Sequence, residues 1–252
     1  MMRRGPAGVP AWWESGEEPV NESSRASAEL AAYEELRAGF TAAVSHELRT
    51  PLARLLALLE SALLGGDDSR ALLEQARDEV HHMNELIDEV LFLSELETGR
   101  EVVSLGPTQV EPVVREVFEE LGDRAARANV RLEAAVEPGL EVPLRPRLLR
   151  VVIENLAGNA ISYAGEGSRF RLSGRRDGSE VVLEAEDDGA GVDPEDLPRL
   201  FERFFRSDRA RASRGTGLGL AIVKHIVTAA GGTVEAGNAV DGGLLIRCTF
   251  AA

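Results

Sequence analysis

The sequence predicts a two-part protein: an N-terminal helical hairpin that pairs with a second copy to form a four-helix bundle, followed by an α/β sandwich domain. Residues 28–100 contain two long amphipathic segments, separated by the helix-ending stretch GGDDS at 65–69. Residues 107–252 change to alternating helix-like and strand-like segments. Residues 1–27 are rich in Pro, Gly, Ser and Glu without any period, which predicts a flexible lead-in.

Each helix of the predicted hairpin carries an apolar stripe. At about 100° per residue, the stripe of the first helix collects positions spaced by three and four: Val44, Leu48, Leu52, Leu55, Leu59 and Leu63. The second helix, which is expected to end near residue 98, has its own stripe: Leu72, Ala76, Val80, Met83, Ile87 and Val90. Because two stripes this wide cannot both be covered within one hairpin, we expect a homodimer whose four helices share a core.

The C-terminal domain is expected to alternate between helices and strands. Its last two predicted strands are joined through a long insert, which favours a mixed or mostly antiparallel sheet with helices on one face. The expected helices are 110–128, 146–163 and 218–230, and the expected strands are 130–136, 169–174, 180–187 and 244–250.

The composition excludes several kinds of partner. The chain has 28 Lys and Arg against 43 Asp and Glu, a net charge of −15, which argues against nucleic acid or an anionic membrane surface as the main partner. Any phosphate must therefore be held by a local site. No apolar run approaches the roughly 18 to 20 residues that span a bilayer. The single cysteine, Cys248, lies in the apolar stretch LLIRCTF, which predicts a buried core residue and fits a reducing compartment.

The stretch SHELRTPL, residues 45–52, places a histidine, an acid and a threonine within one amphipathic helix. His46 points roughly 150° away from the centre of the apolar stripe and Thr50 almost opposite it, so both are expected to face solvent. A neutral imidazole is a competent nucleophile when its second nitrogen donates to a fixed acceptor, and the neighbouring Glu47 can be that acceptor. Pro51 removes one backbone hydrogen bond and predicts a bend. The alternative is an ordinary solvated histidine.

Asn155 and Asn159 lie one helical turn apart among apolar neighbours. Asparagine is a poor helix former, and its amide needs partners when buried. Structural capping would explain one of the two residues. The pair favours a phosphate or hard-cation site, because amide carbonyl oxygens suit Mg²⁺.

Two glycine-rich motifs predict a ligand site with sharp backbone turns. In DDGAG, the glycines Gly189 and Gly191 allow close approach to a flat ligand, and Asp187 can accept a hydrogen bond from an exocyclic amine. An acidic surface turn is the alternative. In GTGLGL, residues 215–220, alternate glycines at a predicted helix start suit a phosphate cradle. Between the motifs lie Phe201, Phe204 and Phe205 and, from 203 to 214, five arginines; this stretch predicts a mobile lid that faces phosphate, or otherwise a solvated charged loop.

Together and in this order, the motifs resemble the catalytic core of bacterial sensor histidine kinases of two-component signalling. The resemblance covers about residues 30–250. SHELRTPL is similar to the H-box, NLAGNA to the N-box, DDGAG to the G1 box, LFERFFR to the F-box and GTGLGL to the G2 box. The resemblance implies a dimerisation and phosphotransfer hairpin followed by an ATP-binding domain of the Bergerat type.

The resemblance also implies roles for individual residues. His46 matches the phosphoacceptor, Glu47 the acid that orients and deprotonates it, and Thr50 a position that helps water attack the phosphorylated response regulator. Asn159 matches the magnesium ligand, with Asn155 beside it. The positions that match nucleotide contacts are Tyr163, Asp187 for the adenine amine, Gly189, Gly191, Arg206 in the lid, and Gly215, Thr216, Gly217, Leu218 and Gly219 in the loop.

The implied activity is ATP- and Mg²⁺-dependent autophosphorylation on His46, followed by transfer to an aspartate of a response regulator receiver domain, with phosphatase activity toward that regulator as an additional role. We expect a cytoplasmic location, for the whole protein or for the cytoplasmic part of a longer membrane-anchored sensor. The rivals are another ATPase or a protein-serine kinase on the same nucleotide fold, and a dimerising scaffold or phosphatase without kinase activity. One departure is Ser162, where the family often has Lys or Arg, so Arg206 or another lid arginine would have to compensate.

Overall fold

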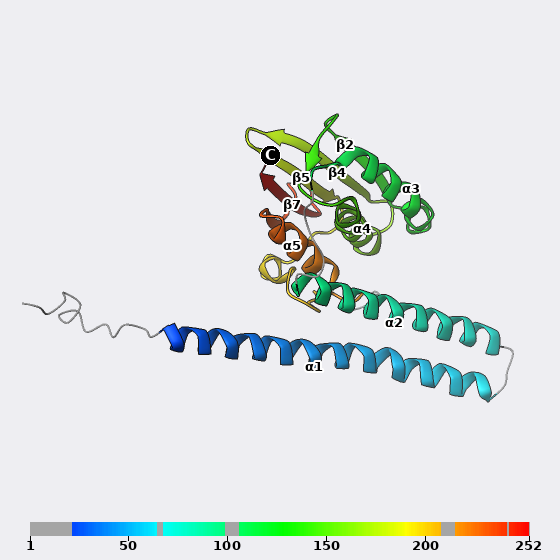
Figure 1. Ribbon diagram of the computed structural model, residues 1–252. Coiled ribbons are helices and arrows are strands. Elements are labelled where there is room, and N and C mark those ends of the chain that lie inside the picture. The colour runs from blue at the N-terminus through cyan, green and yellow to red at the C-terminus, as the bar shows by residue number, and fades with distance from the viewer. Residues whose placement is uncertain (1–21, 65–67, 99–105, 208–214, 241, 252) are drawn as a thin grey trace, which may run out of the picture. The chain divides into compact units, whose positions relative to one another are not determined.

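The computed structural model describes most of the hairpin and of the α/β domain (Figure 1). The predicted lead-in up to residue 21, the turn at 65–67 and the arginine-rich stretch 208–214 lie outside the described residues. The chain divides into two compact units, residues 1–46 and 47–252. The described residues are 22–64, 68–98, 106–207, 215–240 and 242–251.

Two long helices make the predicted hairpin. Helix α1 is Glu22–Leu63, which begins earlier than the expected residue 28, and α2 is Ser69–Glu97. Helix α1 continues through Pro51, whose ring is buried, and the bend at this residue stays a prediction. An ion pair of 3.7 Å between Arg54 of α1 and the almost fully buried Glu79 of α2 connects the two helices.

The prediction of a single apolar stripe on α1 was too simple, because the helix carries two. Leu52, Leu59 and Leu63 of the predicted stripe are exposed, at 55%, 39% and 86%, whereas Leu48 and Leu55 are half-buried. Both sets follow a spacing of three and four, as expected for a helix that has neighbours on two sides. The covered set is Leu48, Pro51, Leu55, Leu58 and Ala62, and the exposed set is Leu52, Leu56, Leu59 and Leu63.

A mixed five-stranded sheet forms the base of the C-terminal domain, with the strand order β2-β4-β5-β7-β6. β2 pairs with β4 in parallel, and the other three pairs are antiparallel, which confirms the predicted mixed sheet. Strand β6 was not predicted, and β1 and β3 form a separate two-residue pair. The strands are β1 Thr108–Gln109, β2 Arg131–Val136, β3 Glu141–Val142, β4 Arg169–Asp177, β5 Glu180–Asp187, β6 Thr233–Asn238 and β7 Leu244–Ala251.

Three helices cover one face of this sheet (Figure 1). They are α3 Val110–Ala128, α4 Pro146–Tyr163 and α5 Gly219–Ala229, close to the predicted ranges. The covered face is apolar: in β4, Phe170 is buried and meets Phe118 of α3 edge to face at 6.1 Å, whereas the adjacent Arg169 is exposed. The opposite face is charged, with Glu184 accepting hydrogen bonds of 2.8 Å from arginines of both neighbouring strands. The core therefore lies between the sheet and the helices.

The single cysteine belongs to the core of the α/β domain. Cys248 is buried as predicted, and burial raises the pKa of its thiol to about 12. Within the described part of the chain, every helix is too short or too polar to cross a membrane.

Candidate functional site

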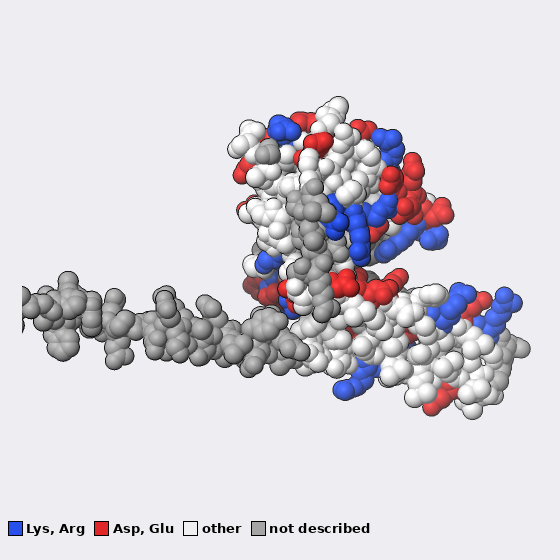
Figure 2. Space-filling view, in the orientation of Figure 1, with Lys and Arg blue, Asp and Glu red and all other residues white. Residues whose placement is uncertain are grey.

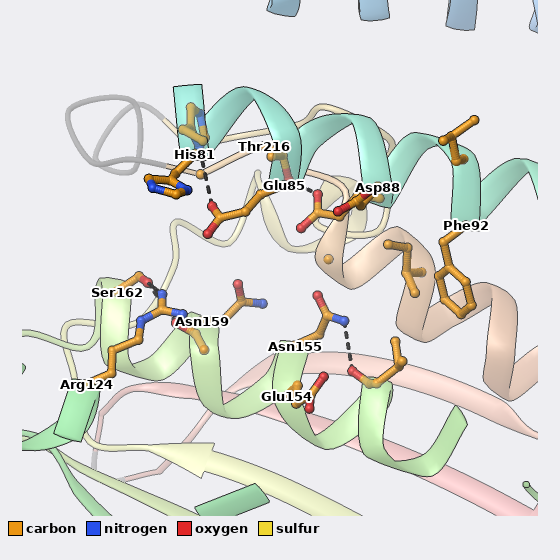
Figure 3. A pocket seen from close by; sticks show the side chains of 18 of the residues that line it. His81, Glu85, Asp88, Phe92, Arg124, Glu154, Asn155, Asn159, Ser162 and Thr216 are labelled. Carbon is orange, nitrogen blue, oxygen red and sulfur yellow. Dashed lines mark hydrogen bonds and ion pairs between the residues drawn. The ribbon is translucent and has the colours of Figure 1, made fainter. Parts of the chain in front are cut away.

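Two cavities meet at the C-terminal half of α4. The smaller has a volume of about 180 Å³ and includes Asp187, Gly191, Arg206 and Gly217 in its lining. The larger is an open cleft of about 970 Å³ that runs along α2 and α4 to the start of α5 (Figure 3). Asn159 and Tyr163 line both cavities. The predicted residues that border the cleft are Asn155, Asn159, Tyr163, Gly215, Thr216 and Gly219.

Asp187 forms one wall of the smaller cavity at the end of β5. Its Oδ1 accepts hydrogen bonds from the backbone N–H of Gly189 at 3.0 Å and of Leu244 at 3.2 Å. Burial raises the pKa of the Asp187 carboxyl, the two backbone donors act in the opposite direction, and the nearby Asp188 adds to the increase. The carboxylate is thus held by the backbone in a half-buried place, where its second oxygen can accept a bond from a ligand.

The DDGAG turn is held by the neighbouring β6–β7 hairpin, through a residue that sequence reasoning missed. The side chain of Asn238 accepts a bond of 2.8 Å from the N–H of Val192 and donates one of 2.7 Å to its carbonyl oxygen. Gly191 has a φ of +69°, and a Cβ there would lie 2.8 Å from Asn238 Oδ1. Gly189 lines neither cavity, but a Cβ there would lie 2.6 Å from the carbonyl oxygen of Ala164. Both glycines are therefore required by packing.

The glycine loop, residues 215–219, packs through its three glycines against helix α4 and the LFERFFR segment. A Cβ on Gly215 would clash with the hydroxyl of Tyr163, and one on Gly219 with the side-chain oxygen of Asn155. Gly217 has a φ of +74°, and a Cβ there would lie 2.8 Å from the backbone of Phe204. The carbonyl oxygen of Gly217 accepts a 2.9 Å hydrogen bond from the N–H of Phe204. The alternate glycines thus bring the loop against both predicted ligand-binding segments.

Thr216 and Leu218 have different positions in this loop. Leu218 is fully buried and lines neither cavity, so its side chain belongs to the core. The Thr216 hydroxyl accepts a 3.2 Å bond from the N–H of Leu218 and donates to the carboxylate of Glu89 on α2. Burial raises the pKa of the Glu89 carboxyl; the bond from Thr216 lowers it and the neighbouring Glu85 raises it further. The loop is thereby connected to α2 through an acid that is costly to ionise.

Asn155 and Asn159 project from the same face of α4 into the cleft (Figure 3). The Nδ2 of Asn155 donates to the carbonyl oxygen of Val151 at 2.8 Å, so its own oxygen faces Gly219. Among the residues that the structure describes, no three or more His, Cys, Asp or Glu side chains gather as a metal site. A pair of amide oxygens fits Mg²⁺, which usually keeps one or two protein ligands and completes its shell with phosphate and water.

Ser162, which stands where the family often has Lys or Arg, contacts an arginine from another helix. The Nη2 of Arg124, on α3, donates to Ser162 Oγ at 3.0 Å, and this hydroxyl donates to the carbonyl oxygen of Gly158 at 2.8 Å. Arg124 lies beside Asn159 in the lining of the cleft (Figure 3). Sequence reasoning did not find this residue, because it precedes Ser162 by 38 positions.

The LFERFFR segment follows the short helix η2, Leu197–Arg199, and borders the smaller cavity. Phe204 adopts a left-handed conformation with a φ of +61°, which is unusual for a bulky residue. The guanidinium of Arg199 lies 4.2 Å from the ring centroid of Phe205, and Arg206 lines the smaller cavity. The implied role of Arg206 near the phosphates stays a prediction.

The three residues of the predicted phosphotransfer motif lie on α1. His46 and Thr50 are exposed, as their angular positions on the helix predicted, and Glu47 is half-buried. Glu47 also contributes to a cavity of about 390 Å³ whose other lining residues come from the LFERFFR region.

The fold and the site together define a class: an α/β sandwich with an aspartate-walled cavity and a glycine loop, preceded by a helical hairpin with an exposed histidine. Comparison with known families agrees. Residues 36–99 match the His Kinase A (phospho-acceptor) domain, and residues 145–252 match the Histidine kinase-, DNA gyrase B-, and HSP90-like ATPase family. The chain is therefore a two-component histidine kinase catalytic core, composed of these two domains.

Individual relatives support the same assignment. The sensor-like histidine kinase SenX3 of Mycobacterium tuberculosis is 35% identical over 212 residues, which cover 82% of this chain and 52% of SenX3. The structure of the Acinetobacter baumannii histidine kinase AdeS matches with a TM-score of 0.69 and 26% identity, over 82% of this chain and 97% of that one. Full-length ShkA matches with a TM-score of 0.62 and 31% identity, over 84% of this chain and 46% of ShkA. The chain spans about half the length of the curated relatives it matches.

Proposed function

We propose that this chain is the kinase core of a protein-histidine kinase that phosphorylates His46 with ATP and passes the phosphoryl group to an aspartate of a response regulator. The observation that carries the proposal is the smaller cavity, which is lined both by the backbone-held carboxylate of Asp187 and by Gly217 of the glycine loop. ShkA, 31% identical to this chain, was solved in complex with AMPPNP, an ATP analogue, which supports a nucleotide as the ligand.

Each cavity suits a different part of the nucleotide: the smaller one suits the base and the larger cleft suits the phosphates. The 180 Å³ cavity suits the adenine ring, whose exocyclic amine would donate to Asp187. The phosphate chain would leave this cavity past Asn159 and Tyr163, which line both cavities, and enter the larger cleft beside the glycine loop. Backbone N–H groups at the start of α5 suit its negative charge.

Asn159, with Asn155 beside it, would hold Mg²⁺ through amide oxygens. When bound, the metal neutralises charge on the phosphate oxygens during phosphoryl transfer. The protein's own residues orient the phosphates and keep the adenine in its cavity.

His46 supplies the nucleophile. One imidazole nitrogen forms a bond to the γ-phosphorus as the bond to the bridging oxygen breaks and ADP departs, and Glu47 accepts the proton of the other ring nitrogen. Little covalent assistance is needed in a loose transition state, so placing the imidazole in line is the main task of the protein. The exposure of His46 on α1 leaves the imidazole accessible to a nucleotide and then to a regulator aspartate. We assign to Thr50, also exposed, the orientation of water in dephosphorylation of the regulator.

The homodimer is part of the same proposal. Leu56 of α1 is 57% exposed, and α2 exposes Leu73, Val80 and Ile87 at intervals of seven residues. Such heptad-spaced apolar surface is large for a helical hairpin in water, and a second hairpin would cover it as a four-helix bundle.

Incubation with ATP labelled at the γ-phosphate tests the proposal. The wild-type protein should become labelled with an acid-labile phosphate and transfer it to a receiver domain from a panel, whereas His46→Gln should bind ATP normally and remain unlabelled. His225→Gln, on α5 and outside both cavities, is the matched control and should label like the wild type.

Three results would contradict the assignment. Full labelling of His46→Gln would exclude His46 as the acceptor. An acid-stable phosphate would favour a serine kinase. If the wild type binds ATP but is neither labelled nor able to transfer phosphate to any receiver domain, the scaffold alternative is favoured.

A further inference from the structure

The larger cleft has an unusual charge distribution for a place that receives a polyphosphate. Its lining includes six acids, five of them on α2, and two arginines, Arg124 and Arg147. Figure 2 shows acidic side chains along the edge of α2 that borders the cleft, with basic side chains across from them. A phosphate chain in this cleft needs nearby positive charge to offset repulsion from the acids.

Arg124 is placed to supply that charge. It projects from α3 to the C-terminal end of α4, where its guanidinium lies beside Asn159 (Figure 3). Arg147, in contrast, lies near the other end of the cleft, where its guanidinium is 5.6 Å from the ring centroid of Phe92. Arg124 is therefore the cleft arginine that adjoins the predicted phosphate and magnesium residues.

Ser162 orients the Arg124 side chain. Its hydroxyl donates to the carbonyl oxygen of Gly158, which fixes the hydroxyl hydrogen and leaves a lone pair that accepts from Arg124 Nη2 at 3.0 Å. A guanidinium has five N–H donors in a planar fork, and the bond to Ser162 uses one of them. Holding a long side chain in place before the ligand arrives lowers the entropy cost of binding.

We propose that Arg124 binds the phosphate chain of the nucleotide and supplies from α3 the positive charge that position 162 lacks in this chain. The inference rests on the proposed nucleotide site and adds a binding residue to it. A serine at 162 and an arginine at 124 then act as one unit: the serine positions the guanidinium, and the guanidinium contacts phosphate oxygen. The lid arginines are not needed to replace the charge missing at position 162.

Calorimetric titration with Mg²⁺–ATP, ADP and adenosine tests the proposal. Arg124→Ala should weaken ATP binding by about tenfold or more, as expected for loss of a charged hydrogen bond, and should leave adenosine binding within about twofold of wild type. Arg127→Ala, three residues further along α3 and outside the cleft, removes the same charge and should bind ATP like the wild type. The double variant Arg124→Ala, Ser162→Lys should recover most of the ATP affinity.

The outcomes separate this inference from the proposed function. A wild-type protein that fails to bind ATP would overturn the nucleotide site itself. If the wild type binds ATP but Arg124→Ala does so equally well, or if adenosine binding falls by the same factor as ATP binding, Arg124 does not contact phosphate. No recovery with Ser162→Lys would overturn the link between the two positions. Arg124→Gln, which keeps a donor for Ser162 without the charge, provides the same comparison if Arg124→Ala does not fold.

Discussion

Replacing Asp187 by Asn tests the chemistry of the smaller cavity while changing almost no volume. Oδ1 of Asp187 already accepts two backbone hydrogen bonds, of 3.0 and 3.2 Å, and an asparagine carbonyl oxygen can keep both. The second oxygen becomes an NH₂ group, which would face the adenine amine donor to donor. A hydrogen bond to a charged group contributes about 1.5 to 3 kcal/mol, so ATP affinity should fall by a factor of about 10 to 150.

Titration of Asp187→Asn with ATP and with ITP, in which a carbonyl replaces the amine, gives the readout. ATP affinity should fall and the preference for ATP over ITP should shrink or reverse. The melting temperature should not decrease, because burial raises the pKa of Asp187 and a neutral amide avoids the cost of an ionised carboxylate there. Unchanged ATP affinity in a folded variant would refute the assignment of Asp187 to the base. An equal loss of affinity for ATP and ITP would show that Asp187 does not distinguish the two bases.

Three further predictions concern other parts of the molecule. Leu56→Glu, in the exposed stripe of α1, should weaken dimerisation about a hundredfold or more, because the dimer would bury a charge. Ser61→Glu, on another face of α1, should leave dimerisation unchanged. A wild-type protein that sediments as a monomer at micromolar concentration would contradict this prediction. Gly217→Ala should reduce ATP affinity, because the φ of +74° and the 2.8 Å approach of a Cβ to Phe204 exclude a side chain. Gly237→Ala, which has open space around it, should bind ATP normally. Equal ATP affinities of the two variants would contradict the packing argument. Glu89→Gln should become more stable than the wild type as the pH rises above the usual carboxyl pKa of 4.5, because the raised pKa of Glu89 in the folded state makes the wild type lose stability through that range. If the melting temperatures of variant and wild type differ by the same amount at pH 5 and at pH 8, the charge of Glu89 is not buried.

The regular elements were predictable where burial is periodic. Helices α3 and α4 were predicted at the observed residues, because buried side chains such as Val113, Val117 and Ile153 repeat at helical spacing. Strand β6 was missed for a physical reason. It is an edge strand that pairs only with β7, none of its side chains is fully buried, and it ends in Gly237 and Asn238, which are typical of turns.

The candidate site was predictable in its motifs but not in its connections between segments. The asparagines of α4 and the glycines that follow β5 and lead into α5 were proposed from local chemistry, and most line one cavity or the other. Asn238 and Arg124 were not proposed, because each acts across a long stretch of chain, on Val192 and on Ser162 respectively. The division of the α1 stripe was missed because one helix alone does not reveal how many neighbours it has.

The alternating glycines of the 215–219 loop also fix its length. Each glycine meets a different partner: Tyr163, Phe204 or Asn155. Inserting or deleting one residue would displace at least one glycine from its contact and place a side chain there. A substitution at Thr216 changes one side chain and leaves the three glycine contacts in register. Natural variation should therefore alter residue identity at Thr216 while keeping the spacing of the glycines, and an engineered loop needs the same number of residues.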